Sequence, residues 1–268
     1  MTSSSELRHR KGKGIMGQEE EFVWDVGDER TDIDKTNAIL VGRIWTSKAI
    51  NARAAIDTMT KLWNPKGNVV GNLIDVKNKI FIFKFELEAD KAKVVNGQPW
   101  HFDKFIWCFN DPISDGRVSD TPLFHVPFWA RVYDLPLRGR SNLENIRRLG
   151  MQLGRYVGVD EAPLPEVERA VRVRVLHDVR SPLRDSVKIT LAKGEKVEFE
   201  VKYEILPIFC YGCGVLGHGE KDCEDGPYEE GELRFSENLR ASPRRVVKTM
   251  AEVDHSKARV LFGDFEEE

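Results

Sequence analysis

A cluster of three cysteines and one histidine, in the spacing C-x2-C-x4-H-x4-C, constrains this chain more than any other feature of its sequence. Its members are Cys210, Cys213, His218 and Cys223. The two-residue gap lets a tight turn direct two sulfurs at one ion, and the longer gaps let the returning chain wrap around it. Gly214 and Gly217 stand where so small a loop needs unusual backbone angles or a close approach. Because the protein fills all four positions of a tetrahedron, the spacing predicts one structural Zn²⁺, without an open position for a catalytic water.

The use of cysteine also indicates a compartment. A secreted disulfide scaffold spreads its cysteines through a short chain, so this clustering predicts a metal site in a reducing, intracellular environment. The N-terminus lacks the apolar core of a signal peptide, and no stretch approaches the roughly eighteen apolar residues of a membrane span. Membrane insertion is therefore not expected. A basic run at residues 8–13 is open to two interpretations, a nuclear-targeting or nucleic-acid arm and a solvated tail.

Three segments are too polar to bury a core. Residues 1–35 turn from basic to acidic with few apolar residues, which predicts a disordered tail. Residues 224–268 hold twelve Asp and Glu against seven Lys and Arg and predict an acidic, mostly disordered tail, with a short helix at 249–262 as the one exception considered. Residues 111–122 are rich in Asp, Ser, Gly and Pro and predict a linker or a long surface loop.

The segment at 36–110 has the pattern of a small α+β domain. Strands are predicted at 37–46, 69–76, 79–87 and 101–109, with helices at 47–63 and 88–97. The order βαββαβ is that of the ferredoxin-like split βαβ sandwich, which RNA-recognition motifs (RRMs) share. Phe81, Phe83 and Phe85 occupy one face of the third strand and are predicted to be core rather than a base-stacking platform.

A second small α+β unit is predicted at 123–208. It comprises strands at 123–135, 169–176, 186–191 and 196–204, and a helix at 141–154 capped by Ser141 or Asn142 and ended by Gly150 or Gly154. This unit leads directly into the cysteine cluster at 209–223.

The segment CYGCGVLGHGEKDC resembles the CCHC zinc knuckle of retroviral nucleocapsid and retrotransposon proteins. The resemblance implies that Tyr211, with Leu216 or Val215, forms a platform for an unpaired base, and that Lys221 contacts phosphate. Stacking on such a platform contributes about 1–3 kcal/mol per base. The residues leave a second role open for Tyr211, which is packing against the preceding unit.

The resemblance extends to about residues 37–223. KIFIFKFELEADKAKVVNGQPWHFDKFIWCF, HVPFWARVYDLPL and VKYEILPIF resemble a plant family that joins a conserved N-terminal domain of unknown function to a C-terminal zinc knuckle. Members are often encoded by, or derived from, LINE-type retrotransposons. The resemblance implies nucleic-acid binding, as in RNA chaperoning or packaging, by an element-derived protein.

Arginines suggest a second contact with nucleic acid. Between residues 131 and 184 there are eleven arginines against seven Asp and Glu, and Arg172 and Arg174 project from the same face of one strand. A solvated strand face paired with Glu198 and Glu200 is the alternative. The formal net charge of -3 argues against a uniformly basic binder, although it can conceal a local patch.

Two functions are therefore considered. The first is a zinc-dependent protein that binds single-stranded nucleic acid, and the second is a protein-interaction module in which zinc is purely structural. Neither needs a small-molecule substrate, and self-association is left open. No phosphate-binding glycine loop, G-x-S-x-G elbow or H-E-x-x-H motif occurs, and Cys108 lies in an apolar strand as a buried thiol. An enzyme is therefore not expected.

Overall fold

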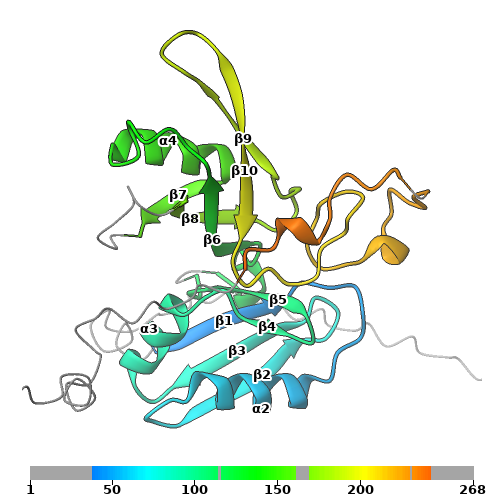
Figure 1. Cartoon of the computed structure of the whole chain (residues 1–268). Coiled ribbons are helices and arrows are strands. Elements are labelled where there is room, and N and C mark those ends of the chain that lie inside the picture. Colours follow the sequence, from blue (N-terminus) through cyan, green and yellow to red (C-terminus); the bar gives the residue numbers. More distant parts are fainter. Residues whose placement is uncertain (1–37, 114–115, 161–168, 230, 243–268) are drawn as a thin grey trace, which may run out of the picture. The chain divides into compact units, whose positions relative to one another are not determined.

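Two antiparallel sheets and few helices make this an α+β protein (Figure 1). The computed structural model describes residues 38–113, 116–160, 169–229 and 231–242. The first part forms β1 (Ile39–Ile44), α2 (Ala52–Trp63), β2 (Val69–Asp75), β3 (Ile80–Phe85), α3 (Glu88–Asn96), β4 (His101–Phe102) and β5 (Phe105–Asn110). The second part forms the 3-10 helix η1 (Val118–Asp120), β6 (His125–Tyr133), α4 (Leu143–Leu153), β7 (Arg155–Val159), β8 (Ala170–Asp178), β9 (Ser186–Thr190), β10 (Lys196–Tyr203) and the 3-10 helices η2 (Glu220–Asp222) and η3 (Glu237–Leu239). No helix among these residues is both long and apolar enough to span a bilayer.

The first sheet has the strand order β2-β3-β1-β5-β4, and every neighbouring pair is antiparallel. Phe81, Phe83 and Phe85 are buried in one core with Met59 and Trp63 of α2, as the alternation in β3 predicted. α2 lies along this sheet in Figure 1. The face of the sheet that α2 covers is therefore a packed core, and its three phenylalanines are not available as a platform for bases.

The start of α2 and the division of one strand are the largest differences from the sequence prediction in this part of the chain. α2 begins at Ala52 rather than at residue 47, because the Asn51 side chain accepts a hydrogen bond from the Ala54 amide at 3.0 Å and caps the helix there. The strand predicted at 101–109 is divided into β4 and β5, because Asp103 and Lys104 both adopt positive φ and form a turn.

The other face of the first sheet is partly covered. Val41, Ile80, Ile106 and Cys108 are buried in the same core cluster as residues of the second sheet. On this face of β3, Ile80 is buried, Ile82 is half-buried and Lys84 is exposed. Burial raises the pKa of the Cys108 thiol to about 12, so this cysteine is the inert buried thiol that was predicted.

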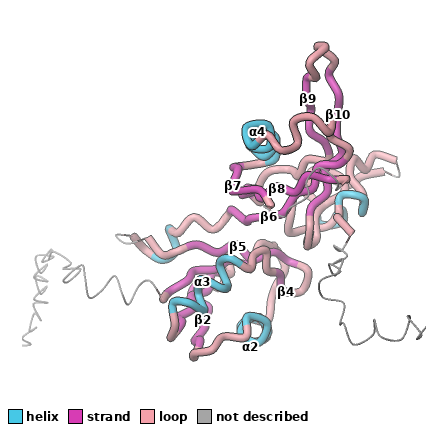
Figure 2. Tube along the Cα trace, turned by 60° about the vertical axis from the view of Figure 1, so that its left-hand side comes forward, coloured by secondary structure: helices cyan, strands magenta, loops and turns pink. Residues whose placement is uncertain are grey.

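The second sheet has the order β7-β8-β6-β10-β9 and is also antiparallel. α4 packs on it through Ile146, Leu149 and Leu153. The helix is capped by Asn142, one of the two predicted caps, and its C-cap is Gly154. β7 was missed by the sequence analysis because RYVGV is short and follows the helix without an intervening turn. β9 and β10 form a long hairpin that is traced clearly in Figure 2.

The prediction of a disordered tail from residue 224 onward is wrong for the described residues 224–229 and 231–242. Phe235 and Leu239 are buried in the core of the second sheet, and Arg240 forms a bridge with Tyr203 of β10. The acidic composition of this segment hid the fact that it packs back onto the core. Two large apolar residues are enough to fix such a short segment against an existing core. The predicted tail at 1–35 and the helix considered at 249–262 lie outside the described residues.

Candidate metal centre

A short hairpin places the first two ligands. Phe209 and Leu216 form an antiparallel bridge, and the Cys210 amide donates to the Val215 carbonyl at 3.0 Å. The Gly214 amide in turn donates to the Cys210 carbonyl at 2.8 Å and closes the turn. Cys210 and Cys213 therefore stand on one tight turn, as the two-residue gap predicted.

Two glycines of the loop are required by both backbone and neighbours. Gly214 and Gly217 have φ of +77° and +92°, a region that side chains other than glycine rarely adopt. A Cβ on Gly214 would lie 2.4 Å from the ring of Phe235, and one on Gly217 would lie 2.5 Å from the carbonyl oxygen of Trp45. The loop is therefore in close contact with the first domain on one side and the returning segment on the other.

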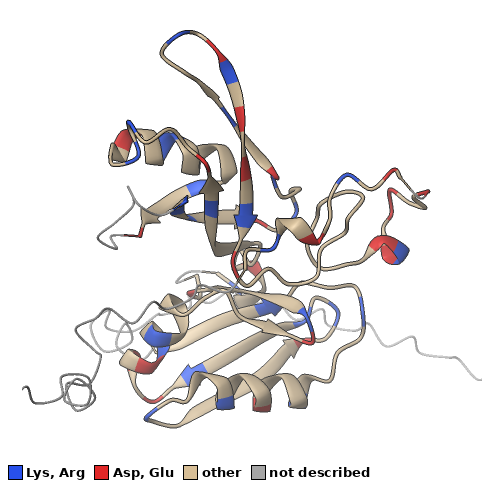
Figure 3. Cartoon of the chain, viewed as in Figure 1, with Lys and Arg blue, Asp and Glu red and all other residues tan. Residues whose placement is uncertain are grey.

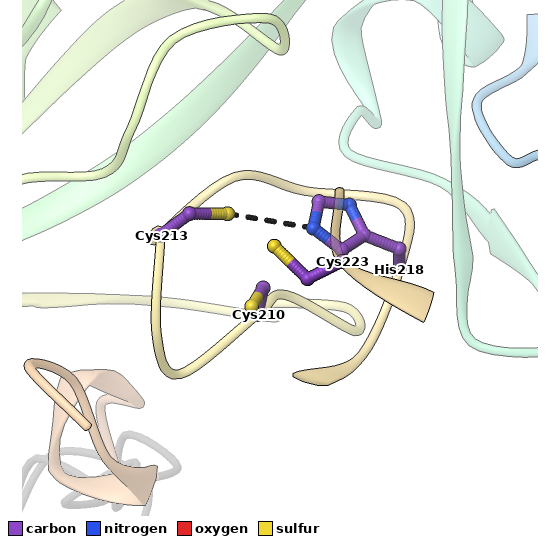
Figure 4. Close-up of side chains that lie close together, drawn as sticks. All are labelled: Cys210, Cys213, His218 and Cys223. Carbon is purple, nitrogen blue, oxygen red and sulfur yellow. Dashed lines mark hydrogen bonds between the residues drawn. The ribbon is translucent and has the colours of Figure 1, made fainter. Parts of the chain in front are cut away.

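The four predicted ligands meet in one cluster (Figure 4). Their ligand atoms all lie within 4.8 Å of one another, and the Cys213 Sγ is 3.4 Å from the His218 Nε2. Zn–S and Zn–N bonds of about 2.0–2.3 Å arranged tetrahedrally need ligand atoms a little under 4 Å apart. The cluster therefore fits one structural zinc ion, and Cys210, Cys213, His218 and Cys223 are the residues that would hold it.

The cluster needs a cation to hold three thiolates. Burial raises the pKa of Cys210 and raises that of Cys213 to about 12. Burial also tends to raise the pKa of Cys223, but hydrogen bonds to its sulfur, led by that of the Tyr228 hydroxyl, outweigh burial and lower this pKa to about 6. A bound divalent ion favours deprotonated sulfur outright, so zinc binding releases protons from this site.

Tyr228 supports the site from outside the motif. Its hydroxyl lies 3.3 Å from the Cys223 Sγ, and its ring covers Gly212, where a Cβ would lie only 2.2 Å away. Sequence reasoning missed Tyr228, Phe235 and Trp45. The available signal was the isolated aromatic residues at 228 and 235 in an otherwise polar segment.

The predicted base platform is largely committed to internal contacts. Leu216 is 1% exposed and belongs to the core, so it does not present a surface to a base. Val215, the alternative, is half-buried. Tyr211 packs against Phe209 with ring centroids 5.0 Å apart, and its hydroxyl donates to the Glu237 carboxylate. Tyr211 therefore has the packing role that the sequence left open. Lys221 is exposed on η2.

Arg172 and Arg174 are also engaged in contacts within the protein. Arg172 pairs with Glu204 at 2.8 Å and with Asp160 at 3.0 Å, and its guanidinium lies over the Trp129 ring. Arg174 donates to the Asn96 carbonyl at 3.1 Å, and desolvation lowers its pKa. The alternative partners named from the sequence were wrong, because β8 pairs with β6 and β7 and does not adjoin Glu198 and Glu200 on β10.

The segment from η2 to η3, which begins inside the knuckle, is mainly acidic (Figure 3). The described acidic residues from η2 to η3 are Glu220, Asp222, Glu224, Asp225, Glu229, Glu232 and Glu237. The described basic residues from Lys221 to Arg240 are Lys221, Arg234 and Arg240. Arg172 is balanced by Asp160 and Glu204, Arg174 is bonded to a backbone carbonyl, and Tyr211 lies beside Glu237, so these three residues do not form a basic contact surface for phosphate.

Because the loop packs closely against Trp45, we expect one methyl group added at Gly217 to destabilise the protein strongly. Gly217→Ala should lower the free energy of unfolding by more than about 2 kcal/mol, because a left-handed backbone strains an L-residue and the methyl group meets a backbone oxygen. Gly219→Ala is the matched control, since φ is −105° there and the nearest atom to an added Cβ is 3.9 Å away. Equal denaturant midpoints for the two variants would contradict this account.

Tyr228→Phe tests the support of Cys223. The variant keeps the ring over Gly212 and removes the hydroxyl, so zinc affinity measured by chelator competition should fall about tenfold. Tyr211→Phe removes a hydroxyl whose partner is Glu237 rather than a metal ligand, and it should leave the affinity unchanged. Unaltered affinity in Tyr228→Phe would show that the hydroxyl does not tune the site.

Comparison with known families agrees with this geometry. Residues 33–109 match the family described as a domain of unknown function (DUF4283), and residues 177–225 match the family described as a zinc knuckle. The second match begins at the end of β8 and includes the β9–β10 hairpin as well as all four ligands. No curated protein matches the sequence. The chain therefore carries a DUF4283 domain followed by a CCHC zinc knuckle.

Proposed function

We propose that this chain is a non-enzymatic, zinc-dependent protein that binds single-stranded nucleic acid. The observation that carries the proposal is the closed Cys3His cluster within a sequence that matches the zinc knuckle. Zinc knuckles are a recurring module for recognising single-stranded RNA, in which unpaired bases are accessible. With four protein ligands the ion has no position for a substrate water, so its role is to fold the loop.

The first domain is proposed to be an RRM-like scaffold. Its element order and the strand order β2-β3-β1-β5 support a split βαβ arrangement with one added strand, β4. The burial of Val41, Ile80 and Ile106 argues that this sheet does not bind bases in the usual RRM manner. We propose that it instead supports the knuckle, through the contact of Trp45 with Gly217.

The origin and location of the protein follow from the same proposal. The pairing of this domain with a zinc knuckle supports descent from a plant LINE-type retrotransposon. Three metal-ligand thiols require a reducing environment, which supports an intracellular location, in the nucleus or the cytoplasm.

A protein-interaction module is the second candidate. It is favoured by the commitment of Tyr211 and Leu216 to internal contacts and by the carboxylates around the knuckle. In this case zinc stabilises the second unit, and the acidic surface repels nucleic acid.

Replacement of one ligand tests the first proposal. Cys213→Ser should lose the zinc and weaken binding of single-stranded RNA at least about tenfold, because the knuckle loop is folded by its metal. Zinc content is measured by mass spectrometry and affinity by fluorescence anisotropy. Cys108→Ala removes a buried thiol that lies outside the cluster, and this variant should retain both its zinc and its affinity for RNA.

Three results decide between the candidates. Loss of both metal and affinity in Cys213→Ser supports nucleic-acid binding through the knuckle. Loss of metal with unchanged affinity shows that the knuckle is not the binding element. Zinc-loaded protein that binds neither RNA nor DNA at low salt supports the protein-interaction module.

A further inference from the structure

Positive charge gathers in a hollow of the described residues that lies away from the predicted surface. A groove of about 720 Å³ is bounded by α4, the loop at residues 135–140 and β9 with the turn that follows it. We name it the hairpin groove. Its charged lining residues are Arg138, Arg140, Arg148, Lys188, Lys193 and Glu195. Five cations and one carboxylate line the groove, and Glu144 and Glu198 pair with two of these cations at its rim, so the groove keeps a net positive charge that attracts anions.

The cations of the hairpin groove differ in how they are engaged. Arg140 is buried and donates to the Leu135 carbonyl, so it fixes the loop. Arg148 and Lys188 form exposed ion pairs with glutamates, at 2.9 and 2.7 Å. Exposed pairs contribute little to stability and can exchange their partner for a phosphate. Arg138 and Lys193 are exposed and form no ion pair with any described residue.

The floor of the hairpin groove is apolar. Ile146, Leu149 and Val171 line it and are buried, so they form a firm base between the charged rims. Two hydrogen bonds hold one end of the groove. The Gln152 side chain donates to the Lys188 carbonyl and accepts from the Lys188 amide, both at 3.1 Å. α4 and the hairpin are therefore tied together as one surface, and they lie side by side in Figures 1 and 2.

A second groove continues from the first toward the metal centre. This knuckle groove, of about 680 Å³, shares Gln152 and Lys188 with the hairpin groove. Its other charged lining residues are Arg184, Arg234, Asp178 and Asp185. Asp178 is already paired with Arg180 at 2.6 Å, and this lowers the local negative charge.

Arg234 connects the knuckle groove with the zinc-binding loop. Its guanidinium lies 5.0 Å from the ring centroid of Phe235, and that ring packs against Gly214 of the loop. A ligand that follows the basic residues from Lys193 to Arg234 therefore reaches the knuckle through residues other than those that line the hollow at Tyr211.

We propose that the two grooves together bind the sugar–phosphate backbone of a single strand of nucleic acid. This inference rests on the proposed function and supplies the contact surface that Arg172, Arg174 and Leu216 do not provide. Arg138, Arg148, Lys193 and Arg184 receive phosphates, and the apolar floor faces sugars and bases. Guanidinium groups suit this role because their planar fork donates two parallel hydrogen bonds to one phosphate.

The arrangement favours nucleic acid over an acidic peptide. Charges on the rim recur along two connected grooves, and a nucleic acid carries one charge per nucleotide with apolar material between the charges. A peptide would need acidic and apolar residues in matching alternation over the same length.

Reversal of two rim charges tests the proposal in the full-length, zinc-loaded protein. Arg138→Glu combined with Lys193→Glu should lower affinity for a labelled oligouridine of about 20 nucleotides at least tenfold, at about 100 mM salt. The slope of log Kd against log salt should fall by about 1.4, because two phosphate contacts are lost. Arg53→Glu combined with Lys61→Glu, on the exposed face of α2, makes the same change in net charge and should leave affinity within about twofold. Circular dichroism and zinc content establish that both variants are folded.

The outcomes separate this proposal from the function on which it rests. Loss of affinity in the groove variant alone supports the grooves as the binding track. Equal loss in both variants, or loss in neither, overturns the track, while RNA binding by the unaltered protein still upholds the proposed function. Competition by polyglutamate as effective as competition by unlabelled RNA overturns the proposal in favour of an acidic protein partner. Failure of the unaltered protein to bind RNA or DNA overturns both.

Discussion

The convergence of three sulfurs and one imidazole on a single cation is the interaction on which the second part of this protein depends. A loop as short as residues 209–223 cannot bury enough apolar surface to fold alone, and metal coordination provides the missing free energy. Once Cys210, Cys213, His218 and Cys223 are fixed, the loop becomes a rigid surface with bare backbone at its glycines. Trp45, Tyr228 and Phe235 each pack against one of those glycines. The knuckle thus joins the first domain and the returning segment.

This packing changes what the knuckle can offer to a ligand. A knuckle exposed on all sides presents its apolar residues to bases, whereas here Leu216 is part of the core and Tyr211 is bonded to Glu237. Carboxylates dominate the surface from η2 to η3. Positive charge is instead gathered between α4 and the β9–β10 hairpin, the same hairpin that the zinc-knuckle match includes. The second part of the chain can therefore bind an anionic ligand through its basic groove while zinc has a separate, structural role in the knuckle.

Local patterns made much of the fold and the whole ligand set predictable. Alternation in β3 predicted the burial of Phe81, Phe83 and Phe85, and fixed spacing predicted the four ligands, because both signals lie within a few residues. The role of Arg172 was not predictable, since its partners Asp160 and Glu204 come from distant segments. The contact of Trp45 with Gly217 and the return of Phe235 were missed for the same reason.

Hydrogen exchange with and without a zinc chelator tests most directly the claim that zinc folds the knuckle into the body of the protein. The relevant amides are those of Leu183, Ile208, Gly217 and Phe235, which donate to the carbonyls of Gly214, Lys104, Ile208 and Tyr211 respectively. Our account predicts that all four lose protection when zinc is removed, while β3 and β8 remain protected. Unchanged protection of these four amides in the metal-free protein would contradict it.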